Sequence, residues 1–141
     1  MVNYKRALLG THGEDALISA YSEALKTYGY NVDLVSPIRQ NGILQEGPEE
    51  VKQRLLDTFL KAEHSEYGYD LVLMDANLSK PGNEPKAVRD FSSNDIVKGR
   101  LQKKDLKLIC FSGNPRTVEQ AKREGFDAVL NVDLVSNLEM F

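Results

Sequence analysis

Short apolar runs alternate with helical segments along this chain, and this alternation limits the possible folds more than any other feature. We predict strands at residues 7–10, 32–35, 71–74, 107–111 and 128–130. The run Leu71-Val72-Leu73-Met74 contains no polar residue, which is typical of a strand that is covered on both faces of a parallel sheet. Strands that alternate with helices imply crossover connections. The pattern therefore predicts an α/β fold with one doubly wound, five-stranded parallel sheet.

The segments between these runs carry signals for helices. We predict helices over 14–28, from Pro48 to residue 66, from Ser93 or Asn94 past Leu101, over 116–124, and a short closing helix over 134–141. Pro48 suits a helix start because its φ angle is already helical, and the acidic Glu49 and Glu50 suit the positive end of the helix dipole. Two polar segments with Gly and Pro, 36–47 and 79–92, are predicted to be long irregular connections, the second with room for one helical turn.

Length and composition indicate the setting in which such a domain works. The chain of 141 residues fits one domain over 1–141, and its net charge of −3 provides no attraction for nucleic acid or anionic lipid. No apolar run approaches the roughly 18 residues of a membrane span. The first residues lead straight into an apolar strand without a secretory signal, and the single cysteine, Cys110, lies in a predicted strand as a buried apolar residue. We therefore expect a cytoplasmic protein.

Polar residues follow the predicted strands at their carboxyl ends, which is where functional groups gather in open parallel sheets. Thr11 and His12 follow the first strand, and Ser112 follows the fourth. Asp75 comes directly after the buried third strand, at its mouth. We therefore single out Asp75 as the principal candidate for a functional residue.

The residues around Asp75 resemble the receiver domains of two-component response regulators. The stretch 69–78, Tyr-Asp-Leu-Val-Leu-Met-Asp-Ala-Asn-Leu, is similar to the third strand of that family and its phosphoacceptor aspartate. Residues 108–113 resemble the fourth strand with its switch hydroxyl, and 121–130 resemble the approach to the fifth strand. The resemblance implies a flavodoxin-like, CheY-like sheet with strand order 2-1-3-4-5. It also implies Asp75 as the candidate phosphoacceptor and Ser112 as the candidate switch hydroxyl.

Several groups of the receiver pattern are replaced in this chain. Receivers have two adjacent acids after the first strand, and Thr11 and His12 take those positions. They have a lysine after the fifth strand, and Val132, which we expect to be half buried, takes that position. The last helix, which is part of the family's output face, is short or missing.

These replacements bear on the metal that the family uses. The resemblance implies a Mg²⁺ ion bound by Asp75 and by the backbone carbonyl of Asn77. Mg²⁺ needs a near-octahedral set of oxygen ligands, usually with one or two carboxylates. Unless Glu14 or Asp15 reaches the site from the following helix, we expect Mg²⁺ to bind weakly, and we expect no other cofactor.

These features predict a stand-alone signalling domain and not an enzyme. We interpret the chain as an atypical or pseudo-receiver that acts through protein contacts, with a histidine kinase or a downstream effector as partner and homodimerisation left open. The alternative is a flavodoxin-like domain that binds FMN, because Gly10-Thr11-His12-Gly13 is loosely similar to a phosphate-binding loop. Against that alternative, Glu14 and Asp15 place negative charge where a phosphate would bind a helix N-terminus.

Overall fold

A five-stranded parallel sheet forms the centre of the molecule in the computed structural model, which describes residues 5–12, 15–65, 67–78 and 85–137. The strands lie in the order β2-β1-β5-β6-β7. They are β1 (Lys5–Gly10), β2 (Tyr30–Val35), β5 (Leu71–Asp75), β6 (Lys107–Ser112) and β7 (Asp127–Leu130). Counted within this sheet alone, the order is 2-1-3-4-5, so the structure confirms the predicted doubly wound α/β fold and its topology.

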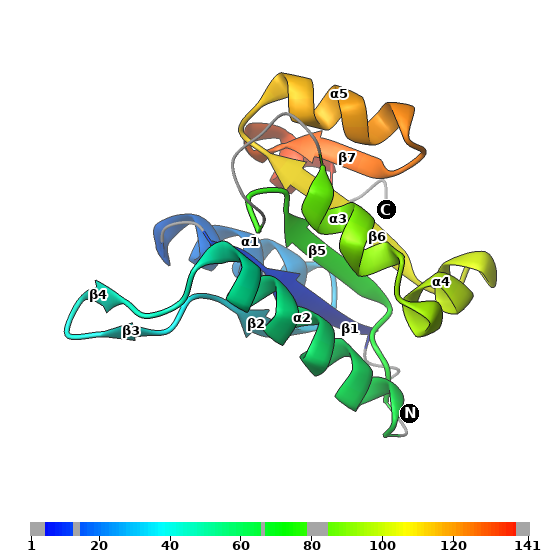
Figure 1. The fold of residues 1–141 in the computed structure, drawn as a ribbon, viewed down its shortest axis with the longest axis horizontal. Coiled ribbons are helices and arrows are strands. Elements are labelled where there is room, and N and C mark those ends of the chain that lie inside the picture. The colour runs from blue at the N-terminus through cyan, green and yellow to red at the C-terminus, as the bar shows by residue number, and fades with distance from the viewer. Residues whose placement is uncertain (1–4, 13–14, 66, 79–84, 138–141) are drawn as a thin grey trace.

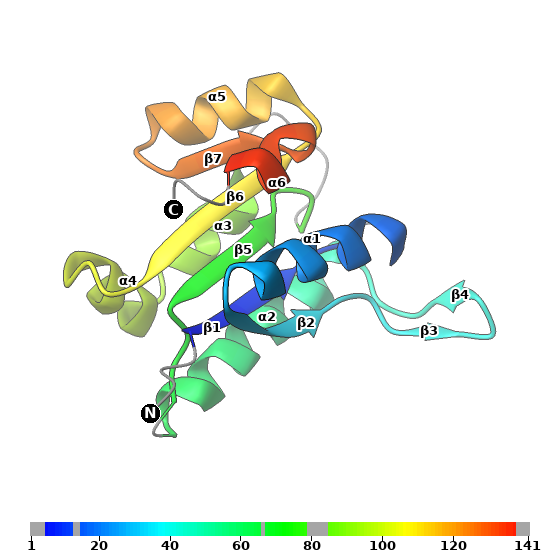
Figure 2. The same ribbon diagram turned by 180° about the vertical axis from the view of Figure 1, so that it is seen from behind.

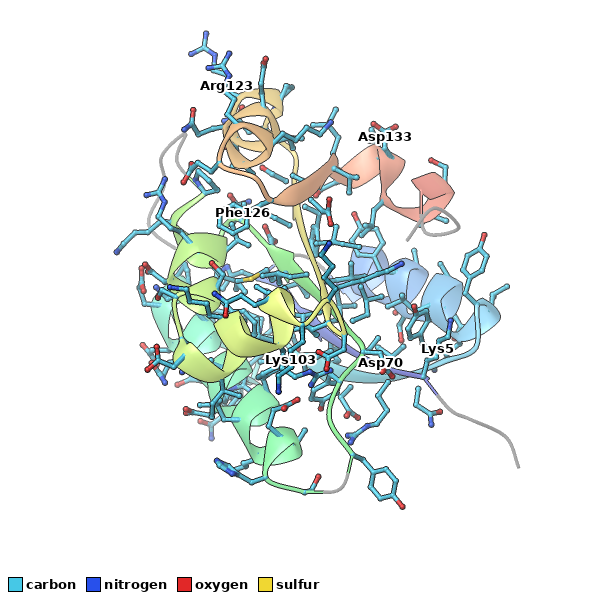
Figure 3. All side chains as sticks on the ribbon, turned by 90° about the vertical axis from the view of Figure 1, so that its right-hand side faces the viewer. Lys5, Asp70, Lys103, Arg123, Phe126 and Asp133 are labelled. Atoms are coloured by element: carbon cyan, nitrogen blue, oxygen red, sulfur yellow. The ribbon has the colours of Figure 1, made fainter. Side chains whose placement is uncertain are left out.

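Helices cover both faces of the sheet (Figures 1 and 2). One face is covered by α1 (Asp15–Thr27) and α6 (Leu134–Asn137). The other is covered by α2 (Pro48–Glu63), α3 (Lys86–Ser92), α4 (Asp95–Gln102) and α5 (Pro115–Arg123). The side view shows α1 on one side of the sheet and α2, α3 and α4 on the other (Figure 3).

Alternating residues of each strand supply two separate cores. Val72 and Met74 of β5 belong to the core beneath α2 and α3, and Leu71 and Leu73 belong to the core beneath α1. All four side chains are buried. Because successive side chains of a strand point to opposite faces, a strand that is apolar at every position needs helices on both sides. The uninterrupted apolar run therefore encodes the three-layered arrangement.

The connection after β5 is more regular than its sequence indicates. We expected room for only one helical turn within 79–92, but Lys86–Ser92 form α3, and residues 79–84 lie outside the described part of the chain. Val88 and Phe91 of α3 are buried, and the ring of Phe91 meets that of Phe59 on α2 edge-on, with centroids 5.6 Å apart. The prediction was therefore wrong for this segment, because a short apolar stripe stabilises a helix directly after Pro- and Gly-containing sequence.

The connection after β2 contains a hairpin, which the prediction of an irregular segment also missed. β3 (Arg39–Gln40) and β4 (Ile43–Leu44) pair antiparallel across a two-residue turn. The φ angles of Asn41 and Gly42 are 54° and 77°. Both lie in the left-handed region that a type I′ hairpin turn requires and that Asn-Gly favours. We refer to residues 36–47 as the arm, which projects beyond the sheet in both views (Figures 1 and 2).

The remaining ends of the helices lie close to their predicted places. α4 begins after Asn94, whose side-chain oxygen accepts hydrogen bonds from the backbone N–H groups of Ile96 and Val97. The 3₁₀ turn η1 (Asn131–Asp133) leads into α6, which has four residues, so the last helix is short, as predicted; residues 138–141 are not among those described. Within the described ranges, no helix is long and apolar enough to cross a membrane.

Candidate functional site

The carboxyl edge of the sheet brings together the polar residues that follow β1, β5 and β6. The strand registers align Gly10 with Met74 and Asp75 with Phe111. Thr11 therefore lies next to Asp75. Thr11 is 1% exposed, Asp75 is 6% exposed and Ser112 is 1% exposed, so all three are buried at this edge.

Neutral hydrogen-bond donors surround the carboxylate of Asp75. The backbone N–H of Asn77 donates to Oδ1 at 2.8 Å, and the hydroxyl of Thr11 donates to Oδ2 at 3.4 Å. The backbone N–H of His12 donates to the same carboxylate. Burial raises the pKa of Asp75 above its usual range, while these donors and the positive form of the His12 imidazole oppose part of that rise. The largest influence on the pKa of Asp75 is therefore the cost of keeping its negative charge out of water.

A metal ion at Asp75 needs further oxygen ligands, preferably carboxylates. Among the residues that the structure describes, no group of three or more His, Cys, Asp or Glu side chains could hold a metal ion. Glu14 and the side chain of Asp15 lie outside that part of the chain. The neighbour of Asp75 directly after β1 is the neutral hydroxyl of Thr11. Weak Mg²⁺ binding at Asp75, with the carbonyl of Asn77 as a second ligand, therefore stays a prediction.

Ser112 takes part in the turn that begins α5. Its Oγ accepts a hydrogen bond from the backbone N–H of Asn114 at 3.0 Å. The side chain of Asn114 in turn accepts from the backbone N–H of Arg116 at 2.9 Å, at the start of the helix. Such side chain to backbone bonds replace missing main-chain partners in turns and at helix ends. The hydroxyl of Ser112 therefore has a structural use, and its role as a switch stays a prediction.

Val132, at the position of the family's lysine, is 86% exposed. The expectation that this residue is half buried was wrong. The reason is local: the chain enters the 3₁₀ turn η1 directly after β7, so Val132 does not continue the strand. A side chain at this position extends into solvent.

Two contacts around the site join residues that no sequence pattern paired. The hydroxyl of Tyr21 on α1 donates to the backbone carbonyl of Asn131 at 3.1 Å, and its ring meets that of Phe111 edge-on at 5.3 Å. Burial, with the charge of Asp75 as a second cause, raises the pKa of Tyr21. The other contact joins His12 to the arm. Both contacts join residues far apart in the chain, so local spacing does not reveal them.

The thiol of Cys110 is 1% exposed on β6, as predicted for a buried apolar residue. Burial, with the charge of Asp75 as a second cause, raises its pKa to about 12. A thiol with a raised pKa carries little thiolate at neutral pH, which is typical of a buried, unreactive cysteine. The FMN alternative depends on Gly13 and Glu14, which lie outside the described residues.

Comparison with known proteins identifies the fold. No protein-family model and no curated protein matches the sequence. Among solved structures, a CheY-like response regulator receiver domain from Methylobacillus flagellatus matches with a TM-score of 0.53 and 19% identity, over 91% of this chain and 86% of that one. An orphan response regulator of H. pylori matches with a TM-score of 0.53 and 18% identity, over 96% of this chain and 94% of that one.

A designed protein matches equally well. A de novo Rossmann 2x3 protein has a TM-score of 0.54 and 10% identity, over 99% of this chain and 89% of that one. The comparisons therefore establish the architecture and leave the activity to be argued from the site. The chain has the flavodoxin-like fold of CheY-like receiver domains, as the resemblance around Asp75 implied.

Proposed function

We propose that this chain is a pseudo-receiver: a signalling domain of two-component type that binds a protein partner through a fixed surface and takes up no phosphoryl group on Asp75. The receiver fold and the sequence around Asp75 support the signalling class. The observation that carries the pseudo-receiver assignment is the contact between Thr11 and Asp75. A neutral hydroxyl donates to the carboxylate at the place where a receiver has a metal-binding acid.

The charge around Asp75 explains why phosphoryl transfer is disfavoured. Attack of a carboxylate on a phosphoryl group brings two anions together, and enzymes offset that repulsion with a divalent cation and a cationic side chain. Asp75 is buried among neutral donors, and Val132 replaces the lysine. The raised pKa of Asp75 reflects the same cost, because burial disfavours the anionic carboxylate that must attack the phosphoryl group.

The partner follows from the class of protein. A pseudo-receiver of this kind binds a histidine kinase or a downstream effector in the cytoplasm, and phosphate does not regulate the contact. Its binding surface is therefore the same whether residue 75 is Asp or Asn. This property separates a pseudo-receiver from a working receiver, in which the partner distinguishes two states of the acid.

The decisive experiment is incubation with Mg²⁺ and acetyl phosphate, followed by intact-mass measurement. We expect no phosphoryl adduct on the wild type or on the Asp75→Asn variant. A phosphoryl adduct on the wild type that is absent from the Asn variant would show that Asp75 is a working phosphoacceptor. In parallel, immobilised wild-type and Asp75→Asn proteins should retain the same set of proteins from an extract. A partner that the Asn variant loses would contradict the fixed surface.

A further inference from the structure

The tip of the arm consists of Asn41 and Gly42, which form the only Asn-Gly pair in the sequence. Both residues are exposed, and nothing lies within 4 Å of the position that a Cβ on Gly42 would occupy. The ladder of the hairpin pairs Gln40 with Ile43, so the two turn residues lie outside it. Among the residues that the structure describes, none accepts a hydrogen bond from the backbone N–H of Gly42. This peptide nitrogen is therefore open to solvent and to reaction.

An asparagine that precedes an unhindered peptide nitrogen can cyclise, and glycine hinders that nitrogen least because it has no Cβ. The nitrogen of Gly42 loses its proton to a base in the solvent and attacks Cγ of Asn41. The new N–Cγ bond forms as the Cγ–Nδ2 bond breaks, and Nδ2 takes up a proton from water and leaves as ammonia. Water then opens the five-membered imide. Opening at Cγ gives Asp, and opening at the main-chain carbonyl gives isoaspartate, whose main chain runs through Cβ and Cγ.

The closed hairpin protects Asn41 from this reaction. Ring closure requires Cβ of Asn41 and the nitrogen of Gly42 to lie on the same side of the bond between Cα and the carbonyl carbon. The φ angles of 54° and 77° at these residues fit a type I′ turn, which holds the two atoms on nearly opposite sides of that bond. The turn must therefore open before Asn41 reacts. The rate of cyclisation is then the rate in an open chain multiplied by the fraction of time for which the arm is open.

The arm opens easily because few contacts hold its two strands together. They pair only with each other, in a sheet separate from the central one, and both ribbon views show the arm extending away from the body (Figures 1 and 2). The ladder consists of Arg39 with Leu44 and Gln40 with Ile43. Ile43 is 65% exposed and contributes little burial. Because an isolated two-stranded hairpin is only marginally stable in water, the tip opens without unfolding of the cores.

The base of the arm is held in place by Arg54 of α2. Its guanidinium donates to both carboxylate oxygens of Glu46, at 3.0 and 2.6 Å, and also to the carbonyl of Ser36 on the other side of the arm. Oε1 of Glu46 accepts from the backbone N–H of Ile38 at 2.9 Å. These bonds tie the two ends of the arm to each other and to the body. Arg54 therefore limits how often the strands separate.

We propose that Asn41 is a site of spontaneous covalent modification, at which cyclisation onto Gly42 converts the asparagine to Asp or isoaspartate. Arg54 sets the rate of this conversion, because it limits the opening of the arm that the reaction requires. Water is the only co-reactant, and ammonia is the only group released. The inference goes beyond the proposed function and does not depend on the state of Asp75. Its failure would leave the pseudo-receiver assignment unchanged.

The first test follows the folded wild type during incubation in neutral buffer, by tryptic digestion and mass spectrometry. Peptide 40–52 contains Asn41 as its only asparagine, and peptide 27–39 contains only Asn31. Asn31 is also exposed, but it lies in the paired strand β2 and precedes the branched Val32, so it serves as the internal control. We expect Asn41 to convert at least tenfold faster than Asn31 and to give both Asp and isoaspartate. Asp alone would indicate direct hydrolysis of the side chain, and equal rates at the two residues would also overturn the proposal.

The second test varies the opening of the arm. Arg54→Met should convert at Asn41 at least tenfold faster than the wild type, and wild type unfolded in guanidinium chloride should convert faster still. The matched control is Arg123→Met, which removes an exposed guanidinium from α5 and should convert like the wild type. Thermal unfolding checks that each variant is folded. Equal rates in Arg54→Met and the wild type would contradict the role of Arg54, and a folded wild type that reacts as fast as the unfolded chain would show that the turn does not protect Asn41.

The third test compares the two products after separation by ion exchange. Asp-Gly fits the same two-residue turn as Asn-Gly, so the Asp form should close again with one added negative charge. Isoaspartate lengthens the main chain by one methylene, so the two-residue turn should not re-form. The backbone N–H of Gln45, which donates to the carbonyl of Ile38 at 2.8 Å in the closed arm, reports the difference through amide hydrogen exchange. We expect exchange at the unmodified rate in the Asp form and at least tenfold faster exchange in the isoaspartate form. The same rate in both forms would show that the modification leaves the arm unchanged.

Discussion

The imidazole Nε2 of His12 lies 3.4 Å from the backbone carbonyl oxygen of Glu46. The backbone N–H of His12 donates to Asp75, and the carboxylate of Glu46 binds Arg54 and the N–H of Ile38. His12, which follows β1, thus contacts both the candidate site and the base of the arm. A change at Asp75 that moved the backbone of His12 would therefore also alter the contact between His12 and Glu46.

The first prediction concerns the base of the arm. Arg54→Met should remove the donors that hold Glu46 and Ser36, so the arm should open more often while the cores remain packed. We expect the backbone amides of Ile38 and Gln45, which are hydrogen-bonded within the arm, to exchange with solvent at least tenfold faster. Amide hydrogen exchange followed by NMR measures this directly.

The matched control for that variant is Arg123→Met. Arg123 projects from α5 into solvent (Figure 3), and both side chains of its ion pair with Glu119 are exposed. This substitution removes a guanidinium without touching the arm. Unchanged exchange at Ile38 and Gln45 in the Arg54 variant would mean that the antiparallel strands alone hold the arm together.

The second prediction concerns the opposite end of the sheet. Arg100 on α4 donates to Glu63 and, at 2.7 Å each, to Asp105 and to the backbone carbonyl of Tyr69. The side chains of Arg100 and Glu63 are only 17% and 15% exposed. Arg100→Met leaves a half-buried carboxylate and a carbonyl without their donor. We expect the free energy of unfolding in urea to fall by about 2 kcal/mol, with no measurable change for Arg123→Met. Equal stability of the two variants would show that solvent replaces Arg100 without loss.

The sheet was predictable because its signals are local and repeated. A strand buried on both faces is apolar at every position, and Leu71-Val72-Leu73-Met74 shows this directly in the sequence. The positions of Thr11, Asp75 and Ser112 at one edge then follow from parallel register. No contact between distant residues had to be known for the parallel sheet or for this part of the site, whereas the strand order came from the resemblance to receiver domains.

The errors have physical causes of two kinds. α3 was missed although its apolar pair, Val88 and Phe91, is present in the sequence, because the Pro and Gly content of the segment indicated a loop. The hairpin of the arm was missed for the same reason, although Asn41 and Gly42 are typical turn residues. The burial of Val132 was predicted wrongly because a 3₁₀ turn replaces the end of the strand. Contacts such as that of Tyr21 with Asn131 join distant segments and have no local signature.

The third prediction concerns the pH dependence of stability. Burial raises the pKa of Asp75 in the folded state. The protonated acid therefore stabilises the fold fully below the unfolded pKa, about 3.9, and this contribution is lost as pH rises through the folded pKa. Asn does not titrate. We expect Asp75→Asn to gain stability relative to the wild type as pH rises from acid to neutral, because the wild type alone loses the contribution of its protonated acid.

Urea unfolding of both proteins across this pH range measures the effect. Asp57→Asn is the matched control, because Asp57 is an exposed carboxylate on α2 that accepts from Gln53. An Asp75→Asn variant that loses stability as pH rises would mean that the donors around Asp75 outweigh its burial, and that its folded pKa is lowered.

The last prediction tests whether Thr11 holds the place of a metal ligand. The hydroxyl of Thr11 lies 3.4 Å from Oδ2 of Asp75, so Thr11→Asp should place a second carboxylate at contact distance. Two buried like charges repel, and without metal the melting temperature should fall. Mg²⁺ should reverse that loss, because binding to the folded state adds about 1.4 kcal/mol at a metal concentration ten times the Kd. Thermal unfolding with and without MgCl₂, at ionic strength matched by NaCl, measures the gain.

Thr11→Asn is the matched control for Thr11→Asp, because Asn has nearly the shape of Asp without its charge. This variant should gain no stability from Mg²⁺, and the wild type should gain little. A Thr11→Asp variant that folds but does not respond to Mg²⁺ would show that residues 11 and 75 do not converge on a metal. A wild type that responds as strongly would show that an acid beyond the described residues, such as Glu14, already completes the site.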